Sequence, residues 1–147
     1  ALDDAAGIGA RTSYFFSRTH RPYWRARYTL TGNPNVAFQV KFINSGGTAG
    51  WGLKFATTDT KIKGFTRTAD VDTDTSVSTW VAGTEVLVEM AVGTNDHLYV
   101  RVGSGTPVDC GAVPSGDMAL YLQAPSGGVA GKFMQVRCDL LIANWIA

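Results

Sequence analysis

Apolar and polar residues alternate with a period of two along most of the chain, which is typical of β-strands with one buried face. In the run VAFQVKFI (36–43), four apolar residues share one face, and Gln39 and Lys41 lie on the other. Two further runs, 85–92 and 97–102, are joined by GTND (93–96), which predicts a tight hairpin. The same alternation predicts strands at 25–30, 51–55, 60–65, 76–81, 118–123 and 133–142.

Helical periodicity is absent from every window longer than one turn, and turn residues recur every eight to fifteen residues. This spacing predicts an all-β fold, a jelly-roll-like antiparallel β-sandwich of eight to eleven strands. A length of 147 residues predicts one domain spanning 1–147, in which residues 1–10 form a flexible arm. No apolar run approaches the twenty or so residues of a membrane-spanning helix.

Two segments resemble the concanavalin A-like jelly rolls, which include the laminin-G-like and galectin-like domains. The segment STWVAGTEVLVEMAVGTNDHLYVRVGSG (78–105) is similar to their central hairpin, and MQVRCDLLIANW (134–145) is similar to the strand that completes the sandwich. The galectin sugar motif, H-x-N-x-R followed by W-G-x-E, is not matched at His20 or at Trp51-Gly52. The resemblance therefore implies the fold, and no sugar-binding residue is carried over from it.

Charge is divided unevenly along the chain. Residues 1–67 hold ten basic and three acidic residues, whereas residues 68–147 hold three basic and nine acidic ones. The favoured interpretation is that both halves interleave in one sandwich. Nucleic-acid binding and complementary contacts between copies of the chain are the alternatives.

Catalytic motifs are missing. The chain has no G-x-S-x-G elbow, no phosphate-binding loop and no H-E-x-x-H sequence, and its only histidines are His20 and His97. A glycosidase needs two carboxylates across a cleft, but Glu85 and Glu89 lie four residues apart on the outward side of one predicted strand. We therefore expect that the protein is not an enzyme.

Alternating carboxylates at Asp70, Asp72 and Asp74 resemble the start of a calcium-binding loop. The EF-hand pattern fails, because Thr75 and Val81 stand where it requires Gly and Glu. A calcium site of another type stays open as the alternative to an acidic surface loop, and no other cofactor is expected.

Two cysteines, Cys110 and Cys138, lie 28 positions apart without the spacing of a zinc site. Cys138 falls on the apolar side of the last strand, which favours a buried free thiol. A single disulfide is left open.

The segment 11–28 interleaves five arginines with six aromatic residues. Tyr, Trp and Arg dominate protein interfaces, whereas arginines beside aromatics also bind single-stranded nucleic acid. We favour a protein interface over nucleic acid, and the third interpretation is a first strand whose aromatics fill the core. The predicted interface residues are Arg18, Arg21, Tyr23, Trp24, Arg25 and Arg27.

Two functional hypotheses follow. The first is a recognition module that binds a glycan or surface receptor, such as a phage or viral fibre or tail adhesin. Its outward polar and aromatic candidates are His97, Tyr99, Arg101, Tyr121, Gln123, Arg137 and Asp139. The alternative is a structural assembly or decoration protein of a virus particle. We expect a homo-oligomer or larger assembly, located outside the cell or on a virion surface. A monomer that binds glycans would support the first hypothesis, and a stable ring or trimer that binds none would support the second.

Overall fold

A computed structural model describes residues 7–30, 38–55, 60–125 and 134–142. Within these ranges the chain forms eleven strands and one turn of 3-10 helix, Arg18–His20. The strands are β1 Gly7–Phe16, β2 Tyr23–Leu30, β3 Phe38–Ile43, β4 Gly50–Phe55, β5 Lys61–Thr68, β6 Val71–Thr79, β7 Glu85–Val92, β8 His97–Val102, β9 Val108–Ala112, β10 Met118–Pro125 and β11 Met134–Ile142. Among the described residues, no helix has the length and apolarity needed to cross a bilayer.

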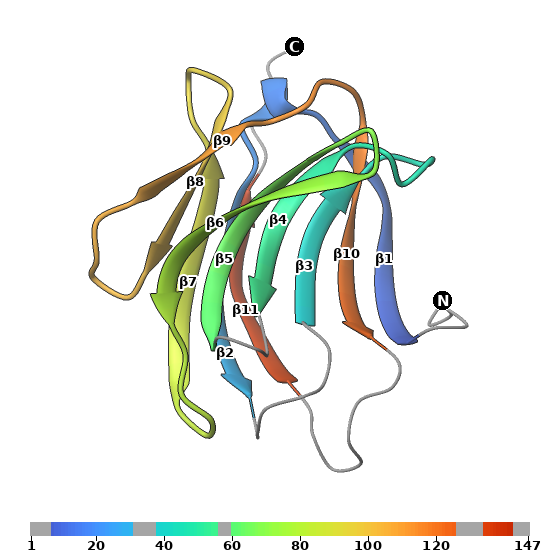
Figure 1. The fold of residues 1–147 in the computed structure, drawn as a ribbon. Coiled ribbons are helices and arrows are strands. Elements are labelled where there is room, and N and C mark those ends of the chain that lie inside the picture. Colours follow the sequence, from blue (N-terminus) through green and yellow to red (C-terminus); the bar gives the residue numbers. More distant parts are fainter. Residues whose placement is uncertain (1–6, 31–37, 56–59, 126–133, 143–147) are drawn as a thin grey trace.

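The strands make two antiparallel sheets packed face to face (Figure 1). One sheet has six strands in the order β1-β10-β3-β4-β5-β6, and the other has five in the order β11-β2-β7-β8-β9. The chain crosses repeatedly between the sheets, so the two halves of the sequence interleave. The predicted antiparallel jelly-roll sandwich is confirmed, and its eleven strands reach the upper end of the expected number.

One hydrophobic core fills the space between the sheets, because the apolar residues of each alternating strand face inward. Trp51 of β4 stacks on Phe42 of β3 with ring centroids 4.0 Å apart, and Phe16 meets Phe42 edge to face at 5.3 Å. From the opposite sheet, Tyr28 of β2 packs against Phe55 of β4 at 4.8 Å. The Tyr28–Phe55 contact crosses between the two sheets, and the other two contacts lie within the six-stranded sheet.

Four regions differ from the predictions made from the sequence. β1 begins at Gly7, so residues 7–10 of the expected flexible arm are paired with β10, while residues 1–6 lie outside the described residues. β6 covers Val71–Thr79, where only 76–81 was expected as strand, and β9 was not expected. In β11 the register shifts between Cys138 and Leu140, so the simple alternation expected over 133–142 does not hold throughout.

Candidate functional site

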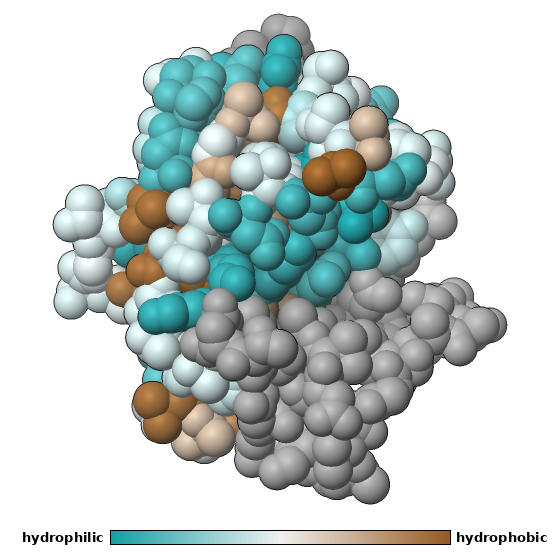
Figure 2. All heavy atoms as spheres, in the orientation of Figure 1, coloured by the Kyte–Doolittle hydropathy of each residue, from teal (hydrophilic) through white to brown (hydrophobic). Residues whose placement is uncertain are grey.

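The outward face of the six-stranded sheet carries a compact group of charged side chains. Directly paired residues lie on the same face of a sheet, and the pairs Lys54–Lys63, Gly52–Phe65 and Phe65–Asp74 therefore share the outward face. Arg67 is paired with Asp72 on that face as well. Figure 2 shows hydrophilic residues gathered over β5 and β6.

Lys54, Arg67, Asp72 and Asp74 form one network, here called the β4–β6 network. Lys54 Nζ lies 2.6 Å from Asp72 Oδ2 and donates a hydrogen bond to Asp74 Oδ1 at 2.7 Å. Arg67 Nε donates to the other oxygen of Asp72 at 2.6 Å and its Nη1 donates to the Gly47 carbonyl at 3.0 Å. The four side chains thus hold one another in fixed positions.

Two side chains of the network are largely buried against the sheet. Lys54 is only 12% exposed and Asp72 only 18%. The ammonium group of Lys54 is 4.7 Å from the centre of the Phe65 ring, which is itself 1% exposed although it lies on an outward face. Burial by itself would raise the pKa of Asp72, but hydrogen bonds from Arg67 and Lys54 outweigh it and hold the pKa below its ordinary value.

Two of the predicted calcium ligands, Asp72 and Asp74, are engaged in ion pairs within this network. The Lys54 ammonium stands between Asp72 and Asp74, where a metal ion would have to lie, and Asp70 is in the turn between β5 and β6. Among the residues that the structure describes, no three His, Cys, Asp or Glu side chains gather as a metal site would require. Asp72 pairs with Lys54 and Arg67, and Asp74 pairs with Lys54.

The outward face of the five-stranded sheet brings together residues that the sequence assigned to two different roles. Arg101, Arg137 and Asp139, predicted to bind ligand, lie beside Arg25 and Arg27, predicted to form an interface. Asp139 Oδ2 is 3.3 Å from Arg27 Nε and 3.8 Å from Arg25 Nε. Longer contacts join Arg137 to Asp139 at 3.8 Å and to Glu85 at 4.0 Å.

Glu89 anchors this second face and is 7% exposed. It accepts hydrogen bonds from Tyr23 OH and Arg101 Nε, both at 2.5 Å. Burial would raise the pKa of Glu89, but the bonds from Tyr23 and Arg101 lower it below its ordinary value. The carboxylate therefore stays ionised, and no described contact gives it the raised pKa of a general acid.

The remaining predicted ligand residues are divided between the sheets. On β8, His97 Nδ1 lies 2.9 Å from Asp109, and Tyr99 OH accepts a hydrogen bond from Asn95 at 3.0 Å. Tyr121 is on β10, where it pairs with Lys41 on the outward face of the other sheet, and Gln123 pairs with Gln39 in the same strands. The structure thus separates Tyr121 and Gln123 from the other five predicted ligand residues.

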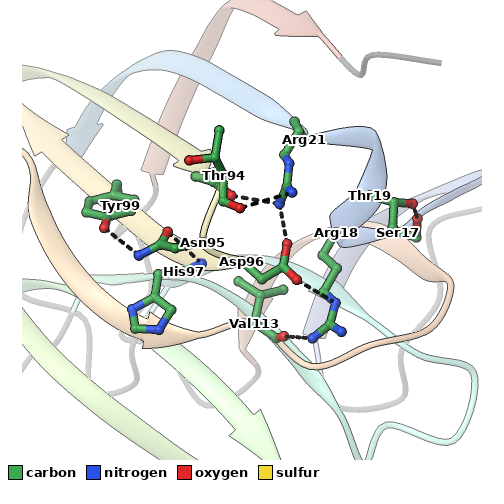
Figure 3. Close-up of polar contacts among 11 residues, drawn as sticks. Ser17, Arg18, Thr19, Arg21, Thr94, Asn95, Asp96, His97, Tyr99 and Val113 are labelled. Atoms are coloured by element: carbon green, nitrogen blue, oxygen red, sulfur yellow. Dashed lines mark hydrogen bonds and ion pairs between the residues drawn. The ribbon is translucent and has the colours of Figure 1, made fainter. Parts of the chain in front are cut away.

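Arg18 and Arg21 hold the β7–β8 turn rather than standing free. Both reach the Asp96 carboxylate, from the side of the 3-10 helix (Figure 3). Arg21 also donates to the Gly93 carbonyl at 2.7 Å, and Arg18 donates to the Val113 carbonyl at 3.2 Å. These hydrogen bonds tie the segment before β2 to two loops of the same chain.

Trp24 does not lie on the surface, and its inclusion among the interface residues is wrong. It faces the core, is 4% exposed, and donates from Nε1 to Tyr28 OH at 2.6 Å. Tyr23, Arg25 and Arg27 are directed outward, as the alternation of burial along β2 shows. Whether their face meets another copy of the chain stays a prediction.

The two cysteines lie on opposite edges of the five-stranded sheet, Cys110 on β9 and Cys138 on β11. Four strand spacings of about 4.8 Å place their backbones about 19 Å apart. A disulfide needs Cα atoms within about 7 Å, so the intrachain bond left open by the sequence does not form. Cys110 is a buried free thiol, and burial raises its pKa to about 11.

Lys54 and Arg67 were missed as site residues. Lys54 lies between the inward residues Leu53 and Phe55 of the predicted strand 51–55, and Arg67 lies after the predicted strand 60–65. Their partner Asp72 is 18 and 5 positions away, respectively, so only the order β4-β5-β6 unites the three. The alternating aspartates were the available signal, and they were interpreted as a calcium loop or an acidic surface loop.

Similarity to known proteins is confined to structure. No protein-family model matches the chain, and no curated protein sequence matches it. The carbohydrate-binding module CBM66 from Bacillus subtilis superposes with a TM-score of 0.59 and 9% identity over 95% of this chain and 82% of its own. The Bacillus licheniformis beta-glucanase gives a TM-score of 0.68 with 11% identity, over 92% and 70%. A toad ovary galectin in complex with thio-digalactose gives 0.51 with 14%, over 91% and 100%.

These structures confirm the expected jelly-roll β-sandwich fold. They also overturn the expectation that the protein is not an enzyme, which rested on missing catalytic motifs, because this fold includes enzymes. The fold is shared with the glucanase and with further structures described as glycosyl hydrolases and a transglycosylase. The absence of hydrolase sequence motifs therefore does not decide between binding and catalysis.

Proposed function

We propose that this protein binds glycans through the outward face of the six-stranded sheet, with the β4–β6 network at the centre of the site. The observation that carries the proposal is the mutual positioning of Lys54, Arg67, Asp72 and Asp74 on three adjacent strands. Two carboxylates and two cations are held at fixed positions and remain partly open to solvent.

Sugar hydroxyls both donate and accept hydrogen bonds, so they match a surface that offers carboxylate acceptors beside ammonium and guanidinium donors. Because ion pairs already fix these side chains, a ligand would cost little further side-chain entropy. The fold is compatible with this role, since the neighbours include a carbohydrate-binding module and a galectin with a bound sugar.

The outward face of the five-stranded sheet is the second candidate surface. His97, Tyr99, Arg101, Arg137 and Asp139 lie on it, and Arg137 is 65% exposed. We favour the other face because its four charged side chains form one network with contacts of 2.6–2.7 Å, whereas the ion pairs of Arg137 and Asp139 on this face are 3.3 Å or longer.

A glycan array probed with three proteins tests the proposal. Wild type is compared with Asp74→Asn, which removes one charge from the β4–β6 network, and with Glu85→Gln, a matched change on the other sheet. We expect Asp74→Asn to weaken glycan binding by at least about tenfold, because a charge-assisted bond is lost, and Glu85→Gln to leave it unchanged.

If Glu85→Gln weakens glycan binding and Asp74→Asn leaves it unchanged, the binding site lies on the five-stranded sheet. A wild-type protein that binds no glycan would contradict the proposal. Each bound glycan is also incubated with the protein and assayed for new reducing ends. Their appearance would show that the site cleaves the glycan that it binds.

We further propose that the protein works where glycans are displayed, outside the cell or on the surface of a phage or virus particle. A fibre or tail adhesin would be a homo-oligomer. Light scattering on the intact chain is expected to give a multiple of 15.7 kDa. A strict monomer would favour a stand-alone module over the adhesin and over the alternative, a particle assembly protein.

A further inference from the structure

Three arginines converge on one carboxylate on the outward face of the five-stranded sheet. Arg25 and Arg27 are two residues apart on β2, and Arg137 of β11 is paired directly with Arg27. Like charges directly opposite one another on neighbouring strands are destabilising. The carboxylate of Asp139 lies among the three side chains, 3.3 Å from Nε of Arg27 and 3.8 Å from Nε of Arg25 and of Arg137. One aspartate therefore faces three guanidinium groups.

These guanidinium groups are poorly hydrogen-bonded. Each has about five N–H donors, yet among the described residues the three groups make a single hydrogen bond, from Arg27 Nη1 to Glu85 at 3.4 Å. Arg137 reaches the same glutamate only at 4.0 Å. Arg101, on the same face, shows the contrast, because its Nε donates to Glu89 at 2.5 Å. The three arginines have ion-pair partners nearby, but most of their donors have no acceptor in the part of the chain that the structure describes.

Two of the unused donors are buried. Nε of Arg25 and Nε of Arg27 are shielded from solvent and have no hydrogen-bond partner, a state that the described residues show elsewhere only at Nε1 of Trp51. A buried N–H group without a partner is costly, and in native proteins it commonly marks a place where water or an ion binds. Because both Nε atoms face the same carboxylate, they indicate a single place where an acceptor with better geometry is needed.

The Asp139 carboxylate does not supply that geometry. Asp139 stands where the register of β11 shifts, between Cys138 and Leu140, so it does not meet the arginines of β2 as a regular cross-strand partner would. A carboxylate has two oxygens in one plane and suits one guanidinium fork, whereas these arginines approach from three positions on two strands. A tetrahedral phosphate or sulfate group directs its oxygens to different sides, so each guanidinium can bind a different oxygen.

We propose that Arg25, Arg27 and Arg137 form a binding site for a tetrahedral oxyanion, a phosphate or sulfate group, which takes the place of the Asp139 carboxylate. Asp139 is 26% exposed and its ion pairs are 3.3 Å or longer, so its side chain can turn into solvent at little cost. The guanidinium groups then donate to the oxygens of the bound anion. This site lies on the opposite face of the sandwich from the β4–β6 network and does not depend on the proposed glycan binding.

NMR of the arginine side chains tests the proposal on the intact chain. Isotope-labelled protein is titrated with sodium sulfate, sodium phosphate or sodium acetate, while sodium chloride keeps the ionic strength constant, and the Nε–H signals of Arg25 and Arg27 are followed. We expect these signals to shift to saturation with sulfate or phosphate, whereas half-saturation with acetate should need at least about fivefold more anion. The sulfate and phosphate titrations distinguish the two kinds of tetrahedral group.

Substitutions test the role of each group. Asp139→Asn should bind sulfate at least about threefold more tightly than wild type, because the competing negative charge is gone. Asp117→Asn makes the same change at an exposed loop position and should alter the affinity by less than about twofold. Arg25→Gln, and the largely exposed Arg137→Gln, should each weaken sulfate binding about tenfold, whereas Arg18→Gln at the β7–β8 turn should change it less than about twofold. Every variant is checked for a wild-type thermal unfolding profile.

Three results would overturn the proposal. Shifts that rise linearly with every salt would show that only adventitious ions meet these arginines. Half-saturation with acetate at the same concentration as sulfate would show a site for carboxylates and not for tetrahedral groups. If Asp139→Asn binds sulfate no more tightly than Asp117→Asn, Asp139 stays in place as a structural partner of the arginines.

Discussion

Replacing Lys54 with methionine removes the ammonium group from between Asp72 and Asp74 while an apolar side chain still covers Phe65. The ammonium lies 2.6 Å and 2.7 Å from the two carboxylates, and Lys54 is 12% exposed. Hydrogen bonds to charged groups contribute about 1.5–3 kcal/mol each, and the greater exposure of Asp74 lets water replace part of its bond. We expect Lys54→Met to lower the free energy of unfolding by about 2–3 kcal/mol at pH 7.

The pH dependence of this loss identifies its cause. The folded-state pKa of Asp72 lies below its ordinary value because Arg67 and Lys54 donate to it. Such a group stabilises the fold above its unfolded pKa of about 3.9, and this contribution is lost as the pH falls through the folded pKa. Without Lys54 the pKa of Asp72 rises, so the difference between variant and wild type should shrink near pH 2.5.

Urea unfolding followed by tryptophan fluorescence at pH 7 and pH 2.5 measures both quantities. Arg137→Met is the matched control, because Arg137 is 65% exposed and its ion pairs are 3.8 Å or longer. We expect this control to cost less than about 0.5 kcal/mol. A Lys54→Met effect no larger than the control, or one that is unchanged at pH 2.5, would refute the network.

Three further predictions concern packing and ionisation. A Cβ atom at Gly64 would lie 2.3 Å from Cys110 Sγ, so Gly64→Ala should cost about 1–3 kcal/mol in urea unfolding. Adding Cys110→Ala should restore more than half of the lost free energy of unfolding. Fully additive effects of the two substitutions would contradict the contact between position 64 and Cys110. With its pKa raised to about 11, native Cys110 should resist iodoacetamide at pH 8, and rapid labelling in peptide mass spectrometry would show that it is accessible. Glu89→Gln should lower stability by about 1–2 kcal/mol at pH 7, since Tyr23 and Arg101 lose an anionic acceptor, and wild-type thermal stability would disprove this role.

Alternation along the chain was sufficient to predict most of the fold. In 36–43 it placed Val40 and Phe42 in the core, and both are fully buried. The same alternation, extended one residue before 25–30, places Trp24 on the inward face. The many Arg and aromatic residues of this segment led instead to the wrong assignment of Trp24 to the surface. Local patterning was the more reliable guide there, because burial is decided strand by strand.

The candidate site was harder to predict because it depends on strand order. Val71–Thr79 has no apolar alternation, so its two aspartates, together with Asp70 before it, suggested a metal loop instead of an edge strand. Lys54 meets Asp72 and Asp74 only because β5 pairs with both β4 and β6. A single sequence shows which residues share one face of a strand, but it does not show which strands are adjacent in the sheet. The ion pairs of the β4–β6 network depend on which strands are adjacent.

The central claim is that glycans bind the outward face of the six-stranded sheet, and an NMR titration tests it most directly. Isotope-labelled protein is titrated with the glycan that binds most tightly on the array, and backbone amide shifts are followed residue by residue. We expect the largest shifts on β4, β5 and β6, at Lys54, Arg67, Asp72 and Asp74, with little change on β2, β7 and β8. Shifts concentrated on Arg25, Glu89 and Arg101 and their neighbours, with an unchanged β4–β6 network, would contradict the account.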